Sequence, residues 1–339
     1  MSFFSVAAGA RGSGLKAFPV ILAGLFAAAC GTAPVIPPAD QPLAKSTLTL
    51  LATKGMAPEA PIFIRIFKED SELEVWKARD DGRFYHFKTY PICNWSGELG
   101  PKLVQGDKQA PEGFYKVFND QMNPNSQYHL AFNIGYPNVY DRAQKRTGQA
   151  LMVHGQCTSS GCYAMTDLLM EEIYGLAREA FKGGQRSFDV HAFPFRMTDA
   201  NMKRVRDNPW YPFWVTLKQG YDHFETHRLP PGIAVCERRY VVNVSYPGNK
   251  AISAERACPR FDRPMIEPFA PTPAEQKMVE ERIVARGLKM RAAANAPEES
   301  APEAAAVAAA EPKTSGGDGW FGLGALTSGS IGSALGFSQ

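Results

Sequence analysis

The sequence predicts an α+β protein that is mainly β, built as one domain with two decorating helices. Between residues 62 and 91, short runs of aromatic and β-branched residues alternate with turn signals, which is typical of consecutive antiparallel strands. Farther along, residues 166–181 and 209–227 place apolar side chains at helical spacing. With 339 residues, 45% of them hydrophobic, the chain can bury one sizeable core, and a second full domain is not required.

The first 29 residues are predicted to be an export signal of the lipoprotein type. Arg11 and Lys16 precede an apolar run at residues 17–29, which ends in small residues before Cys30. The run is too short for a membrane-spanning helix, and Cys30 is the predicted lipidation site, which would hold the protein at a membrane. The alternative is ordinary cleavage within the alanines, which would release a soluble periplasmic protein.

Changes in composition divide the rest of the chain. Residues 30–45 are predicted to be a Pro- and Ala-rich tether, and residues 46–265 the folded domain, which ends among closely spaced prolines. Residues 266–314 are rich in Pro, Ala and Glu and can hold one charged helix, whereas residues 315–339 are a Gly- and Ser-rich tail. Neither of these last two segments shows the pattern of a regular core.

The strands of the domain are predicted from short runs of β-forming residues between turns. The first three should pair as a β-meander, and the last two should close the domain. The predicted strands are residues 62–67, 73–78, 84–91, 115–118, 128–134, 188–192, 233–236 and 239–244.

The first helix should begin at the N-cap Thr166 and end at Gly183. Its apolar positions are Leu169, Ile173, Leu176, Ala177, Ala180 and Phe181. The second helix has an aromatic stripe that is predicted to pack on the core and not to bind a cofactor. His223 and His227 lie four residues apart on it, but no carboxylate motif completes a zinc site. The sequence therefore predicts neither a cofactor nor a metal.

The charge of the chain excludes one class of partner. Its 37 basic and 34 acidic residues leave a net charge of +3, which is too balanced to indicate a nucleic-acid-binding protein. Charge alone identifies no other partner.

A base and a thiol lie close together in the middle of the sequence. His154 ends a short apolar run, and Cys162 comes shortly before the first predicted helix, where the helix dipole would favour a thiolate. Gly155 would leave room for a substrate backbone, while Gly161 would permit a turn that aims backbone amides, including that of Tyr163, at an oxyanion. The pattern indicates acyl transfer by a cysteine nucleophile. The alternative is that Cys162 and Cys157 form a redox or disulfide pair and that His154 only satisfies a buried hydrogen bond.

The residue order of this stretch resembles a known sequence motif. The order His-Gly followed by Ser-x-Gly-Cys is similar to the active-site motif of L,D-transpeptidases, the YkuD-type cysteine enzymes that remodel peptidoglycan. Three further stretches resemble the YafK-type branch: residues 93–102 (CNWSGELGPK), 106–115 (GDKQAPEGFY) and 133–137 (NIGYP). The resemblance covers roughly residues 60–245 and implies a YkuD-like catalytic domain with decorating helices.

The resemblance also implies a role for each motif residue. Cys162 would attack a diaminopimelate carbonyl in a murein stem peptide, His154 would act as general acid and base, and the Gly155 carbonyl would orient its ring. Backbone amides near Gly161, Cys162 and Tyr163 would hold the oxyanion. The sequence departs from the wider family in its short loop before Cys162 and in a serine where most members have a second histidine. These departures leave the substrate preference and the acceptor open.

Six residues are weaker candidates for substrate contacts. Each has a simpler interpretation as a turn, core or surface ion-pair residue. They are Asn133, Tyr136, Ser159, Ser160, His191 and Arg196.

Export would place the remaining five cysteines in an oxidising compartment. With Cys162 free as the nucleophile, the other four can pair in three ways, and the sequence does not decide among them. Cys236 with Cys258 is the most natural pair because these two residues flank a strand-turn segment. The other two are Cys93 and Cys157.

Three functions fit these observations. A transpeptidase would pass the acyl group to an amine, and a hydrolase of the same family would pass it to water, cutting crosslinks or releasing a murein-attached outer-membrane protein. A third possibility is a non-catalytic envelope anchor in which Cys157 and Cys162 are oxidised. The expected partners are peptidoglycan stem peptides and, through a lipid anchor, a membrane. The expected location is the periplasm of a Gram-negative bacterium, at the outer membrane.

Overall fold

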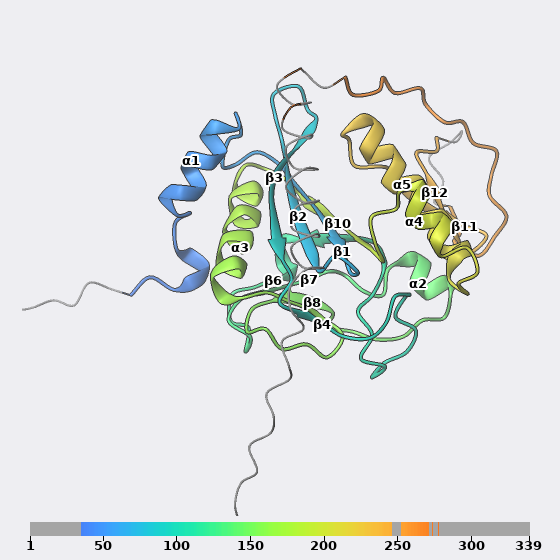
Figure 1. Cartoon of the computed structure of the whole chain (residues 1–339), viewed down its shortest axis with the longest axis horizontal. Helices are drawn as coiled ribbons and strands as arrows, with labels where there is room; N and C mark the ends of the chain where they lie inside the picture. The colour runs from blue at the N-terminus through green and yellow to red at the C-terminus, as the bar shows by residue number, and fades with distance from the viewer. Residues whose placement is uncertain (1–34, 246–251, 271–272, 274–276, 278–339) are drawn as a thin grey trace, which may run out of the picture. The chain divides into compact units, whose positions relative to one another are not determined.

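A five-stranded sheet runs through the centre of the fold (Figure 1). Its strand order is β3-β2-β1-β10-β5, with β1 parallel to β10 and every other pair antiparallel. The strands are β1 (Ile62–Phe67), β2 (Glu72–Ala78), β3 (Phe84–Pro91), β5 (Gly113–Phe118) and β10 (Ser187–Phe193). The predicted opening meander is confirmed. The computed structural model describes residues 35–245, 252–270, 273 and 277, so the predicted signal peptide, Cys30 and almost all of the carboxyl-terminal tail lie outside the described residues.

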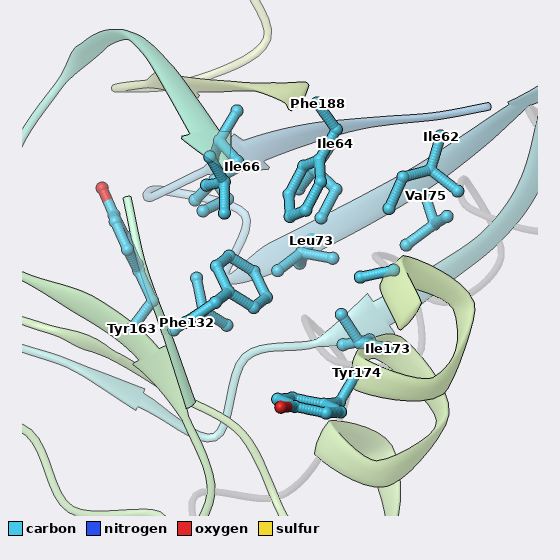
Figure 2. Close-up of a cluster of buried hydrophobic side chains, with 14 of the residues drawn as sticks. Ile62, Ile64, Ile66, Leu73, Val75, Phe132, Tyr163, Ile173, Tyr174 and Phe188 are labelled. Atoms are coloured by element: carbon cyan, nitrogen blue, oxygen red, sulfur yellow. The ribbon is translucent and has the colours of Figure 1, made fainter. Parts of the chain in front are cut away.

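Both faces of this sheet are covered, which is why β1 is apolar at every position except Arg65. Side chains alternate across a strand, so Ile62, Ile64 and Ile66 face one core cluster while Phe63 and Phe67 face the aromatic clusters on the other side. Figure 2 shows the isoleucine side packing with residues of the second sheet and of a helix. The central sheet therefore separates two apolar layers.

A second sheet of five short strands packs on the isoleucine side. Its order is β4-β9-β8-β7-β6, and only β8 and β9 are parallel within it. The strands are β4 (Asn94–Trp95), β6 (Met122–Asn123), β7 (Ala131–Asn133), β8 (Met152–His154) and β9 (Tyr163–Ala164). Three of these have two residues each and were not predicted, because two residues cannot show a strand pattern.

The helix α3 (Asp167–Lys182) covers the same side, next to α1 (Lys45–Thr53) (Figure 1). Thr166 is the N-cap of α3 as predicted, although its side chain makes no capping hydrogen bond. Ile173, Leu176, Ala177 and Ala180 of the predicted apolar stripe are buried, while Leu169 and Phe181 are partly buried against the core. The helix α1 was not predicted.

The helix α5 (Tyr211–His227) covers the opposite side of the central sheet, together with the short helix α4 (Asp199–Arg204). Its predicted aromatic stripe is confirmed as core, with Phe213, Trp214, Tyr221 and Phe224 buried. The short helix α2 (Val139–Ala143) and the hairpin of β11 (Ile233–Cys236) and β12 (Arg239–Val242) complete this side. Neither α2 nor α4 was predicted.

Part of the predicted tether packs against the domain. Residues Pro38–Asp40 form a short 3-10 turn in which Ala39 is buried. The carbonyl of Ala39 accepts a hydrogen bond from the Arg178 guanidinium of α3 (2.5 Å). The later half of residues 30–45 therefore belongs to the packed structure. Across the described part of the chain, no helix is both long and apolar enough to cross a membrane.

A chain truncated after residue 270 is expected to fold with an unchanged thermal transition. The described residues up to 270 form one compact unit, and the division of the chain falls after residue 270. Phe269 belongs to the first unit, because its amide donates to the Thr226 carbonyl (2.7 Å) and its ring contacts Tyr85 (5.6 Å between centroids). Thermal unfolding followed by circular dichroism tests this. A clear drop in Tm would show that the tail contributes to the core.

Candidate active site

His154 ends β8, and Cys162 directly precedes β9, the parallel neighbour of β8 in the second sheet. The register pairs Val153 with Tyr163 and His154 with Ala164, and both Val153 and Tyr163 point into the core. Since side chains alternate along a strand, His154 points to the opposite face, whereas Cys162 packs partly buried against the core cluster. Strand spacing and rise place the Cα atoms of His154 and Cys162 roughly 8 Å apart on the diagonal. The sheet therefore places the two predicted residues on adjacent segments of the chain.

The imidazole of His154 is held in one tautomer. Its Nδ1 lies 2.7 Å from the Gly155 carbonyl oxygen, which can only accept, so Nδ1 carries the proton and Nε2 keeps a lone pair. The predicted orienting role of the Gly155 carbonyl matches this geometry. The ring of Tyr128 packs on the other side, with 4.8 Å between ring centroids. Burial lowers the pKa of His154 below its usual range, opposed by the hydrogen bond to Gly155, so the ring is a neutral base near pH 7.

Cys162 is the free cysteine of the described chain and is partly buried. Its Sγ lies 3.8 Å from the carbonyl oxygen of Ala150. Burial raises the pKa of the thiol, and this outweighs a backbone hydrogen bond at Met152 and the positive charge of Lys102, which both lower it. The resting site is therefore a neutral thiol beside a neutral imidazole, and the predicted thiolate is wrong for this state.

The reason given for a thiolate also fails. Strand β9 and the residues after it separate Cys162 from α3, whose first residue is Asp167. The start of α3 instead meets the loop on the other side of Cys162, where the Asp167 carboxylate accepts a hydrogen bond from the Gln156 amide (2.8 Å). The helix dipole acts within its first turn, so it does not reach the sulfur.

Two of the predicted oxyanion amides are already hydrogen-bonded. The Gly161 amide donates to the hydroxyl of Ser96 (2.6 Å), and the Cys162 amide donates to the hydroxyl of Ser159 (3.1 Å). The Ser159 hydroxyl in turn donates to the Cys162 carbonyl (2.7 Å). The backbone of Tyr163 belongs to β9. An oxyanion would therefore have to displace a hydroxyl from these amides. Gly161 has a φ of +109°, which explains its need for glycine.

Ser96 is a site residue that sequence reasoning did not single out. Besides accepting from Gly161, its hydroxyl donates to the carbonyl of Lys108 (2.7 Å). It joins the stretch at 93–102 to the loop before Cys162. The only feature of the sequence that could have indicated Ser96 is its position within residues 93–102, which resemble the YafK-type branch.

Gly155 is required for a different reason from the predicted one. A Cβ added there would lie 2.6 Å from the carboxylate Oδ1 of Asp167 and 3.0 Å from the carbonyl oxygen of Tyr128. The glycine therefore allows the start of α3 to approach the end of β8. The surrounding atoms explain the glycine by this close packing, and not by a need for room for a substrate backbone.

The remaining candidates near the site have structural partners or are simply exposed. The Asn133 side chain accepts from the Gly135 amide (2.9 Å), and the buried Tyr136 donates its hydroxyl to the Lys102 carbonyl (3.2 Å). Both therefore act as turn or packing residues in this structure. Ser160 is exposed on the loop before Cys162.

His191 and Arg196 do not belong to the site. His191 is buried on the aromatic side of the central sheet, with ring centroids 4.7 Å from Phe63 and 4.6 Å from Phe114. Neither of its ring nitrogens has a hydrogen-bond partner among the described residues, and burial pushes its pKa well below the usual range. The interpretation of His191 as a second cleft histidine is wrong, because it is a core residue.

Arg196 is surrounded by acidic side chains. Its guanidinium forms ion pairs with Asp70, Glu72 and Glu74, and its side chain lies over the ring of Phe67. Its charge is therefore compensated by these three carboxylates. The structural interpretation of Arg196 is therefore the correct one.

The four other cysteines form two disulfides, Cys93–Cys157 and Cys236–Cys258. The second is the pair favoured from the sequence. The first rules out the alternative in which Cys157 is oxidised with Cys162, because Cys157 already has a partner. Cys162 remains available for chemistry.

A fully buried ion pair supports the segment that holds Ser96. Lys68, just after β1, donates to Glu112 (3.1 Å), and the carboxylate of Glu112 also accepts from the Gly100 amide (2.7 Å) and the Trp214 indole (2.8 Å). Lys68 donates further to the carbonyls of Glu98, Gly100 and Ala110. These bonds tie the central sheet, α5 and residues 98–112 together.

Comparisons with known proteins show the family of the chain. No family model matches the sequence. The chain is 47% identical over 184 residues to the protein named "Putative L,D-transpeptidase YafK" in Escherichia coli K12, and equally to its counterpart in strain O157:H7. The alignment covers 54% of this chain and 74% of each relative.

Among solved structures, the chain is similar to two at low scores. The helical cell shape determining protein Pgp2 of Campylobacter jejuni gives a TM-score of 0.33 at 19% identity, covering 53% of this chain and 64% of that one. Bd1075 of Bdellovibrio bacteriovorus gives 0.28 at 19% identity, covering 49% and 62%. The chain spans slightly less than two thirds of each of these structures.

Proposed function

Because this chain belongs to the YafK-like branch of the L,D-transpeptidases, we propose that it remodels cell-wall peptidoglycan by cysteine acyl transfer on murein stem peptides. One observation supports this most strongly. The free thiol of Cys162 directly precedes β9, the parallel neighbour of the strand that ends at His154, and Nδ1 of His154 is fixed on a carbonyl so that Nε2 can take a proton. The other four cysteines of the described residues are bound in disulfides and cannot serve as the nucleophile.

The neutral resting pair sets the order of steps. As Sγ of Cys162 attacks the carbonyl of a diaminopimelate residue, the thiol proton passes to Nε2 of His154. The oxyanion takes the place of a serine hydroxyl at the amides of Gly161 and Cys162. His154 then protonates the leaving amine, the C–N bond breaks and a thioester remains on the sulfur.

The acceptor decides the product. An amine that attacks the thioester forms a new crosslink and makes the protein a transpeptidase. Water regenerates a carboxylic acid and makes it a hydrolase, able to cut crosslinks or to free a murein-attached outer-membrane protein. Both reactions use the same nucleophile and base.

Incubating the full chain with defined muropeptides and following it by mass spectrometry tests the proposal. A thioester on Cys162 with a new crosslink identifies a transpeptidase, and a thioester with cleavage identifies a hydrolase. Absence of any adduct across a panel of tetra- and pentapeptide stems would leave the non-catalytic anchor as the better description.

His154→Ala is expected to slow acylation by on the order of a hundredfold or more, the usual effect of losing a positioned general base. The base works only when unprotonated, and burial lowers the pKa of His154, so the wild type should stay active in mild acid. The acid limb of its kcat/KM profile should lie below the ordinary histidine range. A wild-type limb above that range would contradict the burial argument.

We further propose that the protein acts in the periplasm, held by a lipid on Cys30. The two disulfides support export to an oxidising compartment. Labelled fatty acid should be incorporated into the wild type and lost in Cys30→Ala. Recovery of the wild type as an unlabelled soluble species would contradict the anchor and favour cleavage within the preceding alanines.

A further inference from the structure

The loop between β8 and β9 holds an unfavourable backbone conformation just before the nucleophile. Gln156 has a φ of +66° and Cys157 a φ of +47°, so two successive residues with side chains are left-handed. Such residues are disfavoured sterically and keep this conformation only where their surroundings impose it. The contacts made by this loop therefore decide where Cys162 lies.

One segment, residues 93–96, holds the loop at two points. At its start Cys93 is bonded to Cys157, and at its end the Ser96 hydroxyl accepts from the Gly161 amide (2.6 Å). The segment is itself fixed, because Asn94 and Trp95 pair with the residues of β9.

The backbone on both sides of the disulfide is anchored to the strand that follows the nucleophile. The Cys93 amide donates to the Ala164 carbonyl (2.9 Å), and the Cys157 amide donates to the Met165 carbonyl (3.2 Å). The Cys93–Cys157 disulfide therefore links two segments that are both hydrogen-bonded to the chain just after Cys162. We call this disulfide the clasp. Removing it would leave the left-handed turn at residues 156–157 without its strongest constraint.

The two disulfides differ in their accessibility. Cys93 is exposed and Cys157 is partly buried, whereas Cys236, at the end of β11, is completely buried and its partner Cys258 is partly buried. A reductant reaches an exposed disulfide more readily than a buried one. Reduction under native conditions should therefore open Cys93–Cys157 first.

From these observations we propose that the Cys93–Cys157 bridge positions Cys162, and that reduction by a dithiol oxidoreductase switches the site off. The inference rests on the proposed function for its effect on turnover. In the reduction, the S–S bond breaks and two electrons and two protons pass to it, giving two thiols, while the thiols of the reductant become a disulfide. Reoxidation restores the clasp and the active site. Cys93 and Cys157 are positioning residues here and do not touch the substrate.

The test compares two double variants, each of which keeps Cys162 as the free thiol among residues 35–245 and 252–270. Cys93→Ala/Cys157→Ala removes the clasp, and Cys236→Ala/Cys258→Ala removes the other bridge as a matched control. With a muropeptide substrate, the clasp variant should lose at least about tenfold in kcat with little change in KM, because small misplacements of a reacting group are costly. The control should keep its kcat. Equal kcat values in the two variants would overturn the proposal.

Alkylation of Cys162 by iodoacetamide gives a second measurement that needs no substrate. The pH midpoint of the alkylation rate should shift in the clasp variant and stay at the wild-type position in the control. An identical midpoint in all three proteins overturns the positioning role, even if both variants are less stable. If the wild type turns over no muropeptide, the proposed function fails, and the alkylation profile still decides this inference.

Partial reduction of the wild type covers the case in which the clasp variant does not fold. Dithiothreitol is added until peptide mapping shows that only Cys93 and Cys157 have been reduced, while circular dichroism confirms an intact fold. The alkylation midpoint should then shift and return after reoxidation. If the pH midpoint of Cys162 alkylation is the same with Cys93–Cys157 reduced or oxidised, the inference is overturned.

Discussion

Cys162→Ala should abolish the thioester adduct with murein peptides altogether. The thiol is the only one left free among the described cysteines, and it directly precedes the strand next to that of His154. Without the sulfur no covalent intermediate can form, whatever the acceptor. Intact-mass spectrometry of the variant after incubation with the same muropeptide panel measures this directly.

The matched comparison uses the cysteine five residues earlier. Removing Cys157 together with its partner Cys93 should leave adduct formation detectable at a reduced rate, since the nucleophile remains. An adduct that persists in Cys162→Ala and disappears in the Cys93/Cys157 variant would show that the wrong sulfur has been assigned.

Glu112→Ala is expected to lower the free energy of unfolding by about 3–5 kcal/mol, the usual cost of breaking one side of a buried ion pair. Lys68 and Glu112 are both completely buried, and the substitution would also leave the Gly100 amide and the Trp214 indole without their acceptor. Burial already lowers the pKa of Lys68, and the charge of Glu112 opposes that shift. Urea unfolding followed by tryptophan fluorescence measures the loss.

An exposed ion pair provides the control for Glu112. Glu69 contacts Arg204 at the surface, where both side chains are well exposed to water. Glu69→Ala should change the free energy of unfolding by no more than about 0.5 kcal/mol. Equal losses in the two variants would mean that burial of the Lys68–Glu112 pair does not determine its contribution.

Much of the central sheet could be predicted because its strands are long and lie between clear turns. The bounds of β1, β3 and β11 agree with the prediction to the residue. The two-residue strands β4 and β9 could not be found this way, although they position Cys162. Their pairing depends on tertiary contacts that no local pattern shows.

The roles of the site residues stay predictions, although one contact expected from the motif is present. Nδ1 of His154 lies on the Gly155 carbonyl, because the two residues are adjacent at the end of β8. The charge state of Cys162 depends on the atoms around its sulfur, and burial there raises the pKa of the thiol. The same limit applies to His191, since a sequence cannot show which face of the sheet receives a side chain.

The parallel pairing of β1 with β10 has a consequence for how the protein folds. Ile64 pairs with Val190, and every strand of the second sheet lies between these two positions along the chain. The first sheet cannot close until the segment that contains Cys162 has been made and folded back. Long-range pairings of this kind slow folding and make it cooperative. An incomplete chain that ends before β10 would therefore lack the closed sheet that supports the site, so the reactive thiol becomes functional only when the whole domain is present.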